Sequence, residues 1–200
     1  MKKIISLLLF TFILNVSVSG QMSSELKNTL TDAVKEQVAS LRVYISYMAD
    51  KDNDIDFRKS YKAEALSLFI AEGNSYIDDG IKKKGVLMET TSLYRKKPLR
   101  RLMRDYFDGV INYKYSKVEI ESTQAYEMEV SNLKPVGDHR YECTVCYEQV
   151  FKAYSDGRLV YSDRTTKKMR VYIYAEETMD GIDYIIRLGD VTAVETKKLN

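Results

Sequence analysis

The sequence contains one short motif with recognisable chemistry, the C-x-x-C formed by Cys143 and Cys146. Redox motifs of this kind lie at a helix N-terminus, where the thiolate is stabilised. Here the alternating apolar residues Tyr141, Val145 and Tyr147 indicate a strand. In a strand the two Cα atoms would lie about 10 Å apart, beyond the roughly 7 Å that a disulfide spans. We therefore expect Cys143 to be a small core residue and Cys146 a half-exposed one, with pairing of Cys146 to another molecule as the alternative.

The single histidine, His139, follows Asp138 in a predicted loop. A catalytic triad or a metal site needs further groups, and nothing in the sequence marks them. A zinc site at the two cysteines would require two more ligands. We expect His139 to be a solvated turn residue, and we expect no metal and no cofactor.

Basic residues cluster at 82–84 and 95–97 and continue with Arg100, Arg101 and Arg104. On a helix, Arg100 and Arg104 would lie on one side, opposite an apolar face. One interpretation is a solvated helix face, balanced by the glutamates of the first predicted strand. The other is a docking patch for an acidic partner, such as an anionic glycan, a lipid head group or an acidic protein surface.

The first twenty residues have the composition of a secretory signal peptide. Lys2 and Lys3 precede a largely apolar run over 4–16, and small residues follow before Gln21. The run is too short for the ~20 residues of a membrane-spanning helix. We expect export after cleavage, with residues 21–200 as one soluble domain.

The charge balance argues against a nucleic-acid partner. The whole chain has 31 Lys and Arg against 29 Asp and Glu. Removing Lys2 and Lys3 leaves 31 − 2 = 29 basic residues against 29 acidic ones, because no acidic residue precedes Glu25. A protein that neutralises phosphates normally carries a basic excess.

The first half of the mature chain is predicted to be helical. Over 25–50 the apolar residues recur every three or four positions, which is typical of a long amphipathic helix. Asp54 or Asp56 can cap a second helix, which would end near Gly73. Pro98 suits the first turn of a third helix, and 85–94 could form a short strand between the second and third helices.

After Tyr115 the hydrophobic period changes from 3.6 to 2, which predicts strands. The apolar residues have even numbers in 118–130, odd numbers in 141–151 and in 169–175, and even numbers in 182–188. These even and odd numbers determine whether each connecting loop has an even or an odd number of residues, because antiparallel partners must point to the same face. They predict one antiparallel meander of long, strongly coiled strands, covered by the helices.

The turns give specific registers. A loop over 134–137 would pair Met128 with Cys143. A three-residue turn over 155–157 would pair Cys143 with Met169, and a two-residue turn at Asp180-Gly181 would pair Ile173 with Leu188.

This order of elements resembles the NTF2-like superfamily, whose members roll the sheet into a cone around a pocket. Three stretches, 85–89, 141–143 and 187–191, are also similar to uncharacterised exported bacterial proteins of this type. The resemblance implies an α+β fold of N-terminal helices packed on a strongly curved antiparallel sheet. It leaves the activity open, since such cones host isomerases, dehydratases, ligand binders and protein-interaction modules.

The enzymes of that superfamily place carboxylates, His or Tyr on the inner face of the cone. The residues that parity assigns to this face include no Asp, Glu or His; they are Tyr126, Met128, Val130, Tyr141, Cys143, Val145, Tyr147, Gln149, Thr165, Met169, Val171, Ile173, Ile186 and Leu188. A general base would have to come from a helix or loop, with Glu64, Glu89 or Asp105 as candidates.

We therefore expect an exported, non-catalytic binding or protein-interaction module whose ligand is a small molecule or a protein. The pocket candidates are Tyr126, Met128, Tyr147, Gln149 and Thr165. Tyr147 and Gln149 have an alternative interpretation as core and mouth residues with satisfied hydrogen bonds. The alternative functions are a small-molecule enzyme that uses the cone pocket and a subunit that forms a homodimer through its sheet.

Overall fold

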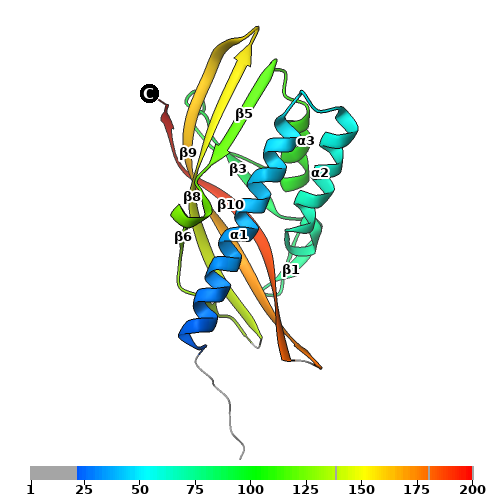
Figure 1. Cartoon of the computed structure of the whole chain (residues 1–200), viewed down its shortest axis with the longest axis vertical. Helices are drawn as coiled ribbons and strands as arrows, with labels where there is room; N and C mark the ends of the chain where they lie inside the picture. Colours follow the sequence, from blue (N-terminus) through cyan, green and yellow to red (C-terminus); the bar gives the residue numbers. More distant parts are fainter. Residues whose placement is uncertain (1–21, 138, 180, 200) are drawn as a thin grey trace, which may run out of the picture.

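The structure is a computed structural model that describes residues 22–137, 139–179 and 181–199. The proposed signal peptide, residues 1–20, lies outside this part of the chain. Figure 1 shows three α-helices packed against one side of a long, twisted sheet. The α+β architecture expected from the sequence, with N-terminal helices packed on a curved sheet, is confirmed.

Two of the expected helices form, but the second ends at Ser67 rather than near Gly73 as predicted. Helix α1 spans Ser24–Ala49, and the Ser23 side chain caps it by accepting a hydrogen bond from the Leu26 amide. Helix α2 spans Ile55–Ser67 and is capped by Asp54, which accepts from the amides of Asp56 and Phe57. Both caps satisfy amides that have no partner within the helix. Within the described residues, no helix combines the length and the apolar character needed to cross a membrane.

The predicted start of the third helix is wrong. Residues Leu99–Leu102 form strand β4, and helix α3 begins only at Met103 and ends at Ile111. Strand β4 pairs antiparallel with β3, which spans Leu87–Thr90. Pairing with a neighbouring strand, which the local sequence does not encode, therefore outweighs the helical signal of Pro98.

The main sheet has the strand order β4-β3-β10-β9-β8-β5. Its main antiparallel strands are the short β5 (Lys117–Ser122) and the long β8 (Arg140–Ser155), β9 (Arg158–Thr178) and β10 (Gly181–Lys198). These four pair antiparallel in sequence order, as predicted, whereas β3 joins β10 in parallel. The pieces β6 (Glu129–Val130) and β7 (Lys134–Pro135) pair with β8, and a separate hairpin consists of β1 (Tyr76–Asp78) and β2 (Ile81–Lys83).

The expected strand over 118–130 is interrupted. A short 3-10 turn over Ala125–Glu127 separates β5 from β6, so the alternation does not continue through it. Val118 still pairs with Ala153, but Val130 pairs with Val145, so the predicted pairing of Met128 with Cys143 does not form. The prediction that the whole segment keeps one register with the next strand is therefore wrong.

The other two predicted registers are each wrong by two residues. Cys143 pairs with Val171, and Ile173 pairs with Ile186. Asp156 and Gly157 both have positive φ and form a two-residue turn, and a bulge next to Ala153 supplies the odd residue that parity requires. Asp180 of the last predicted turn lies outside the described residues. A slip of two keeps every side chain on the same face, which is why the hydrophobic pattern could not exclude it.

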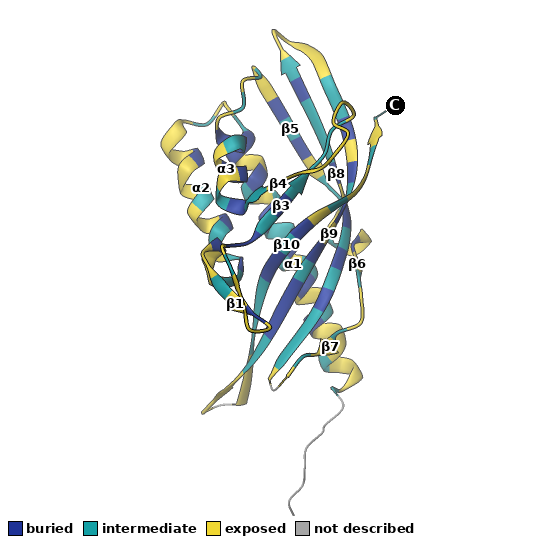
Figure 2. Cartoon of the chain, turned by 180° about the vertical axis from the view of Figure 1, so that it is seen from behind, coloured by how far each residue is buried: buried dark blue, intermediate teal, exposed yellow. Residues whose placement is uncertain are grey.

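The core lies between the helices and the concave face of the sheet, as the buried bands in Figure 2 show. Met48 and Phe107 from the helices and Met88, Met169 and Leu188 from the sheet are fully buried there. A bulge between Leu188 and Val191 lets the Asp190 carboxylate accept a hydrogen bond from the Leu87 amide at 2.8 Å. Strand β3 is thereby held beside β10.

The helices are joined by a buried arginine. Arg58, in the first turn of α2, donates from Nε to the carbonyl oxygen of Met48 at 2.9 Å and from a terminal nitrogen to the carbonyl oxygen of Ile111. Met48 belongs to the last turn of α1, and Ile111 ends α3. One guanidinium therefore donates hydrogen bonds to carbonyls at the C-terminal ends of two helices, where the helix dipole favours a cation.

Candidate functional site

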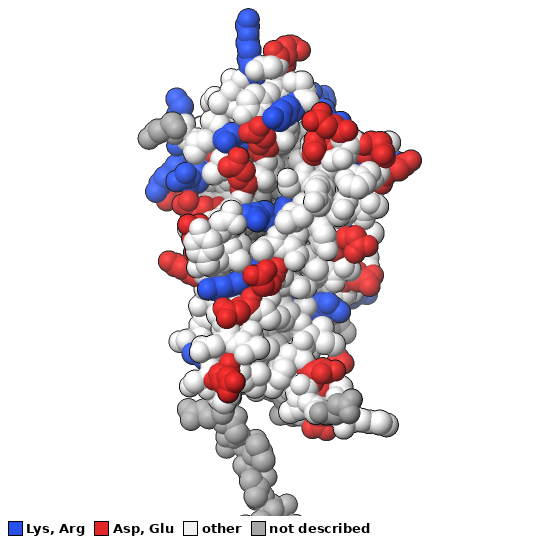
Figure 3. All heavy atoms as spheres, in the orientation of Figure 1, with Lys and Arg blue, Asp and Glu red and all other residues white. Residues whose placement is uncertain are grey.

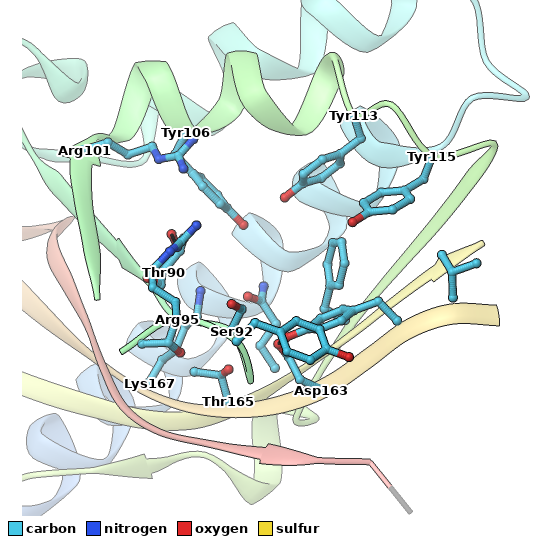
Figure 4. Close-up of a pocket in the computed structure, with 16 residues that line it drawn as sticks. Thr90, Ser92, Arg95, Arg101, Tyr106, Tyr113, Tyr115, Asp163, Thr165 and Lys167 are labelled. Carbon is cyan, nitrogen blue, oxygen red and sulfur yellow. Dashed lines mark hydrogen bonds between the residues drawn. The ribbon is translucent and has the colours of Figure 1, made fainter. Parts of the chain in front are cut away.

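A cavity of about 510 Å³ lies between α3 and the sheet. Figure 4 shows its construction: Tyr106, Tyr113 and Tyr115 point from α3 and the segment after it toward β9, which carries Asp163, Thr165 and Lys167. The remaining wall comes from β3, β4, β8 and the loop after β3. The complete lining is Thr90, Thr91, Ser92, Tyr94, Arg95, Arg101, Tyr106, Tyr113, Tyr115, Gln149, Phe151, Val160, Tyr161, Asp163, Thr165 and Lys167.

Asp163 places a carboxylate inside the cavity. It is only 5% exposed and accepts a hydrogen bond at Oδ2 from the Tyr161 hydroxyl. Tyr161 in turn accepts from the Leu93 amide at 3.0 Å, which fixes its orientation. Burial raises the pKa of Asp163, while the Tyr161 hydrogen bond and the charge of Lys167 lower it in part.

Lys167 is a buried ammonium group on the same face of β9. It is 3% exposed, and its Nζ lies 3.6 Å from the Met88 sulfur and 5.7 Å from the centre of the Tyr106 ring. Within the described residues, no carboxylate oxygen lies within 4.0 Å of Nζ. Burial lowers the pKa of Lys167 to about 8, with a smaller opposing effect from Asp163.

Arg101 supplies a second cation from β4. Its Nε is buried without a hydrogen-bond partner among the described residues. Figure 4 shows its guanidinium next to Tyr106, the ring that also contacts Lys167. An unpaired buried donor is costly unless a ligand or water accepts from it.

Aromatic rings and their hydroxyls make up much of the remaining wall. Burial raises the pKa of Tyr106 well above its usual value and raises the pKa of Tyr113 to about 12. Burial and the bond to Asp163 raise the pKa of Tyr161 to about 12. These hydroxyls are therefore neutral at pH 7, and they offer hydrogen bonds rather than negative charge.

No protein-family model matches this chain, and no curated protein shows a significant match to it. Among solved structures, it is similar to a proposed scytalone dehydratase from Novosphingobium aromaticivorans, with 10% identity, a TM-score of 0.39 and coverage of 86% of this chain and 92% of that one. It is also similar to a type 2 hexachlorocyclohexane dehydrochlorinase (LinA), with 12% identity, a TM-score of 0.38 and coverage of 88% and 94%.

The structure separates the five predicted pocket residues into three locations. Gln149 and Thr165 line the cavity. Met128 and Tyr147 are buried beneath α1, around a second space of only about 10 Å³. Tyr126 is 78% exposed on the 3-10 turn that interrupts the predicted strand, so its inward placement is wrong.

The structure also places the three arginines of the predicted basic patch in different surroundings. Arg100 points away from the cavity and pairs with Glu89, Arg101 lines the cavity, and Arg104 donates to the Gly73 carbonyl and the Asn74 side chain. The strand over Leu99–Leu102 separates Arg100 from Arg101, because neighbouring residues of a strand point to opposite faces, whereas Arg104 lies in α3. Figure 3 shows acidic and basic side chains interspersed over the face viewed there.

The candidate general bases, the two cysteines and the histidine considered in the sequence analysis all lie outside the cavity. Glu64 and Asp105 are exposed on α2 and α3, and Glu89 is engaged by Arg100. Cys143 is buried and free, with a pKa that burial raises to about 12, and Cys146 is partly buried and free. His139 is exposed in a turn. Among the residues that the structure describes, no group of three or more His, Cys, Asp or Glu could hold a metal ion.

The expectation that the inner face carries no carboxylate is wrong, because Asp163 lies there together with Lys167. The signal that could have found them was the parity of the segment itself. Asp163 and Lys167 have the same odd parity as Thr165 and Met169, which were assigned inward. Charged residues at inward positions are exceptional in a core and are typical of a site.

Proposed function

We propose that the cone cavity binds a small organic anion with a flat, aromatic body. The observation that carries this proposal is the charge of the lining: Arg95, Arg101 and Lys167 are basic, and Asp163 is the single acidic residue among the lining residues. A concave, partly buried wall that carries an excess of positive charge attracts an anion. The buried Nε of Arg101 lacks a partner that a carboxylate would provide.

The size and the walls of the cavity support the same class of ligand. Its volume of about 510 Å³ lies in the range of small-molecule sites. Tyrosine rings and Phe151 surround it, and these offer faces against which an aromatic ring packs.

Calorimetric titration with benzoate at pH 7 tests the proposal. We expect benzoate to bind more tightly than benzamide, which has the same shape without the charge. Arg101→Gln should weaken benzoate binding by about tenfold or more, because a hydrogen bond to a charged group is lost. Arg100→Gln is the matched control, since this neighbour points away and pairs with Glu89. Equal binding of benzoate and benzamide, or equal losses in the two variants, would contradict an anion site.

A second candidate function is an isomerase- or dehydratase-like acid/base enzyme, which Asp163 favours. A buried carboxyl with a raised pKa is the kind of group that general acid/base catalysis uses. If Asp163 abstracts a proton next to a carbonyl, the protein should accelerate deuterium exchange at the methylene group of phenylpyruvate in D2O, as measured by NMR. Asp163→Asn should remove that acceleration, and Asp156→Asn, in the distant turn, should preserve it.

Export and dimerisation through the sheet remain predictions. Export is supported by the composition of residues 1–20, and N-terminal sequencing of the mature protein should begin near Gln21. Dimerisation would make the mass from light scattering depend on concentration, whereas a constant monomer mass would exclude it.

A further inference from the structure

We propose that Lys167 forms a reversible imine with a small aldehyde or ketone that also carries a carboxylate and occupies the cone cavity. The inference rests on the proposed anion-binding function and adds the chemical class of the ligand. Its basis is a buried primary amine that lines the same cavity as Arg101, whose buried Nε has no hydrogen-bond partner among the described residues.

The surroundings of Lys167 favour an uncharged amine. The contacts of Nζ are the Met88 sulfur and the face of the Tyr106 ring, neither of which neutralises an ammonium group. The charged and titratable groups around it are Asp163 on β9, Arg101 on β4, Tyr106 on α3 and Tyr147, its partner on β8. Desolvation of the buried amine is the larger effect and disfavours the ammonium form, and Asp163 favours it only in part.

A neutral amine is the nucleophile that imine formation requires. The nitrogen of Lys167 attacks the carbonyl carbon, and the carbonyl oxygen leaves as water with the two protons of the amine. A carbon–nitrogen double bond replaces the carbon–oxygen double bond, and no oxidant or reductant takes part. Because burial lowers the pKa of Lys167 to about 8, about a tenth of the amine is neutral at pH 7, and this fraction grows as the pH rises.

The cavity also orients such a ligand. Arg101 and Lys167 both lie against Tyr106, so a carboxylate held by Arg101 would leave the other end of a short molecule near Nζ. The tyrosines would pack against an aromatic body between the two groups. We therefore expect carboxylated aromatic carbonyl compounds to react better than uncharged ones.

The test uses 4-formylbenzoate and sodium cyanoborohydride with the folded protein at pH 7. The reductant transfers a hydride to the imine carbon and solvent supplies a proton to nitrogen, which leaves a stable secondary amine. Peptide mass mapping then locates the adduct. Lys168 is an internal control, because it is the next residue on the same strand and is exposed on the opposite face.

We expect Lys167 to be modified on the order of 100-fold faster than Lys168, which follows from its larger neutral fraction. Lys167→Met should abolish the fast adduct, Lys168→Met should leave it, and an excess of benzoate should suppress it. Benzaldehyde, which lacks the carboxylate, should label Lys167 more slowly.

Two results would overturn the inference and can be told apart. Labelling spread over surface lysines, with Lys167 no faster than Lys168 although benzoate binds, would refute the imine and leave the anion site intact. Slow labelling together with absent benzoate binding would refute both. Fast labelling that persists in Lys167→Met would assign the chemistry to another lysine and equally refute the inference.

Discussion

Lys167→Met should raise the free energy of unfolding at pH 7 by about 3 kcal/mol, because methionine removes a buried ammonium while it keeps the side-chain length. The pKa of this amine falls from an ordinary 10.5 to about 8 in the folded protein. Above pH 10.5 the lysine is neutral in both the folded and the unfolded protein, so its burial carries no charge penalty. The penalty grows as the pH falls from 10.5 toward 8, because only the unfolded protein then takes up the proton. The advantage of the variant should be full below about pH 8 and should fade toward pH 10.5.

Urea denaturation of the wild type and the variant across pH 6–10.5 measures this effect. Lys168→Met is the matched control and should change stability by less than about 0.5 kcal/mol, as expected for an exposed site. A loss of stability in Lys167→Met, or a gain that does not depend on pH, would show that the ammonium is satisfied where it lies. A gain would indicate that this lysine is kept at a cost in stability, as is common for residues in functional sites.

Arg58→Met should lower the free energy of unfolding by about 3 kcal/mol, because two hydrogen bonds from a charged donor are lost and the carbonyls of Met48 and Ile111 lose their partner. The side chain is 7% exposed, so water cannot easily replace it. The effect should appear as a lower urea midpoint with an unchanged slope.

Lys59→Met, at the exposed neighbouring position, provides the comparison for Arg58. Lys59 makes only a 4.0 Å ion pair with Asp56, and both side chains are exposed. Its removal should cost less than about 1 kcal/mol. Similar losses in the two variants would contradict the role of Arg58 in joining the ends of α1 and α3.

Much of the fold could be predicted from local patterns. The long helix α1 and the four main antiparallel strands follow from apolar residues at periods of 3.6 and 2, which the structure buries on one face. The pairing registers of the strands were harder to predict, because a shift of two residues, as at Cys143 and Val171, leaves the same residues buried. Strand β4 could not be predicted, because its pairing with β3 depends on contacts that arise only in the folded chain.

The site was only partly accessible from sequence. Gln149 and Thr165 were recognised as inward-facing polar residues, and both line the cavity. Asp163 and Lys167 were missed although parity placed them on the same face, and Arg101 was assigned to a helix. Tyr106 and Tyr113 reach the cavity from α3 and the residues after it, and no local pattern predicts where a helix lies over a sheet.

The most direct test of the cavity as a ligand site is the titration of Lys167 by NMR, with lysines labelled at Cε and Nζ, in the absence and presence of saturating benzoate. We expect a pKa near 8 for the free protein and a higher value with benzoate, because a bound anion favours the ammonium form. The Nζ signal of the exposed Lys168 at pH 7 should be the same with and without benzoate. An unchanged Lys167 titration at saturating benzoate would contradict an anion site beside this amine.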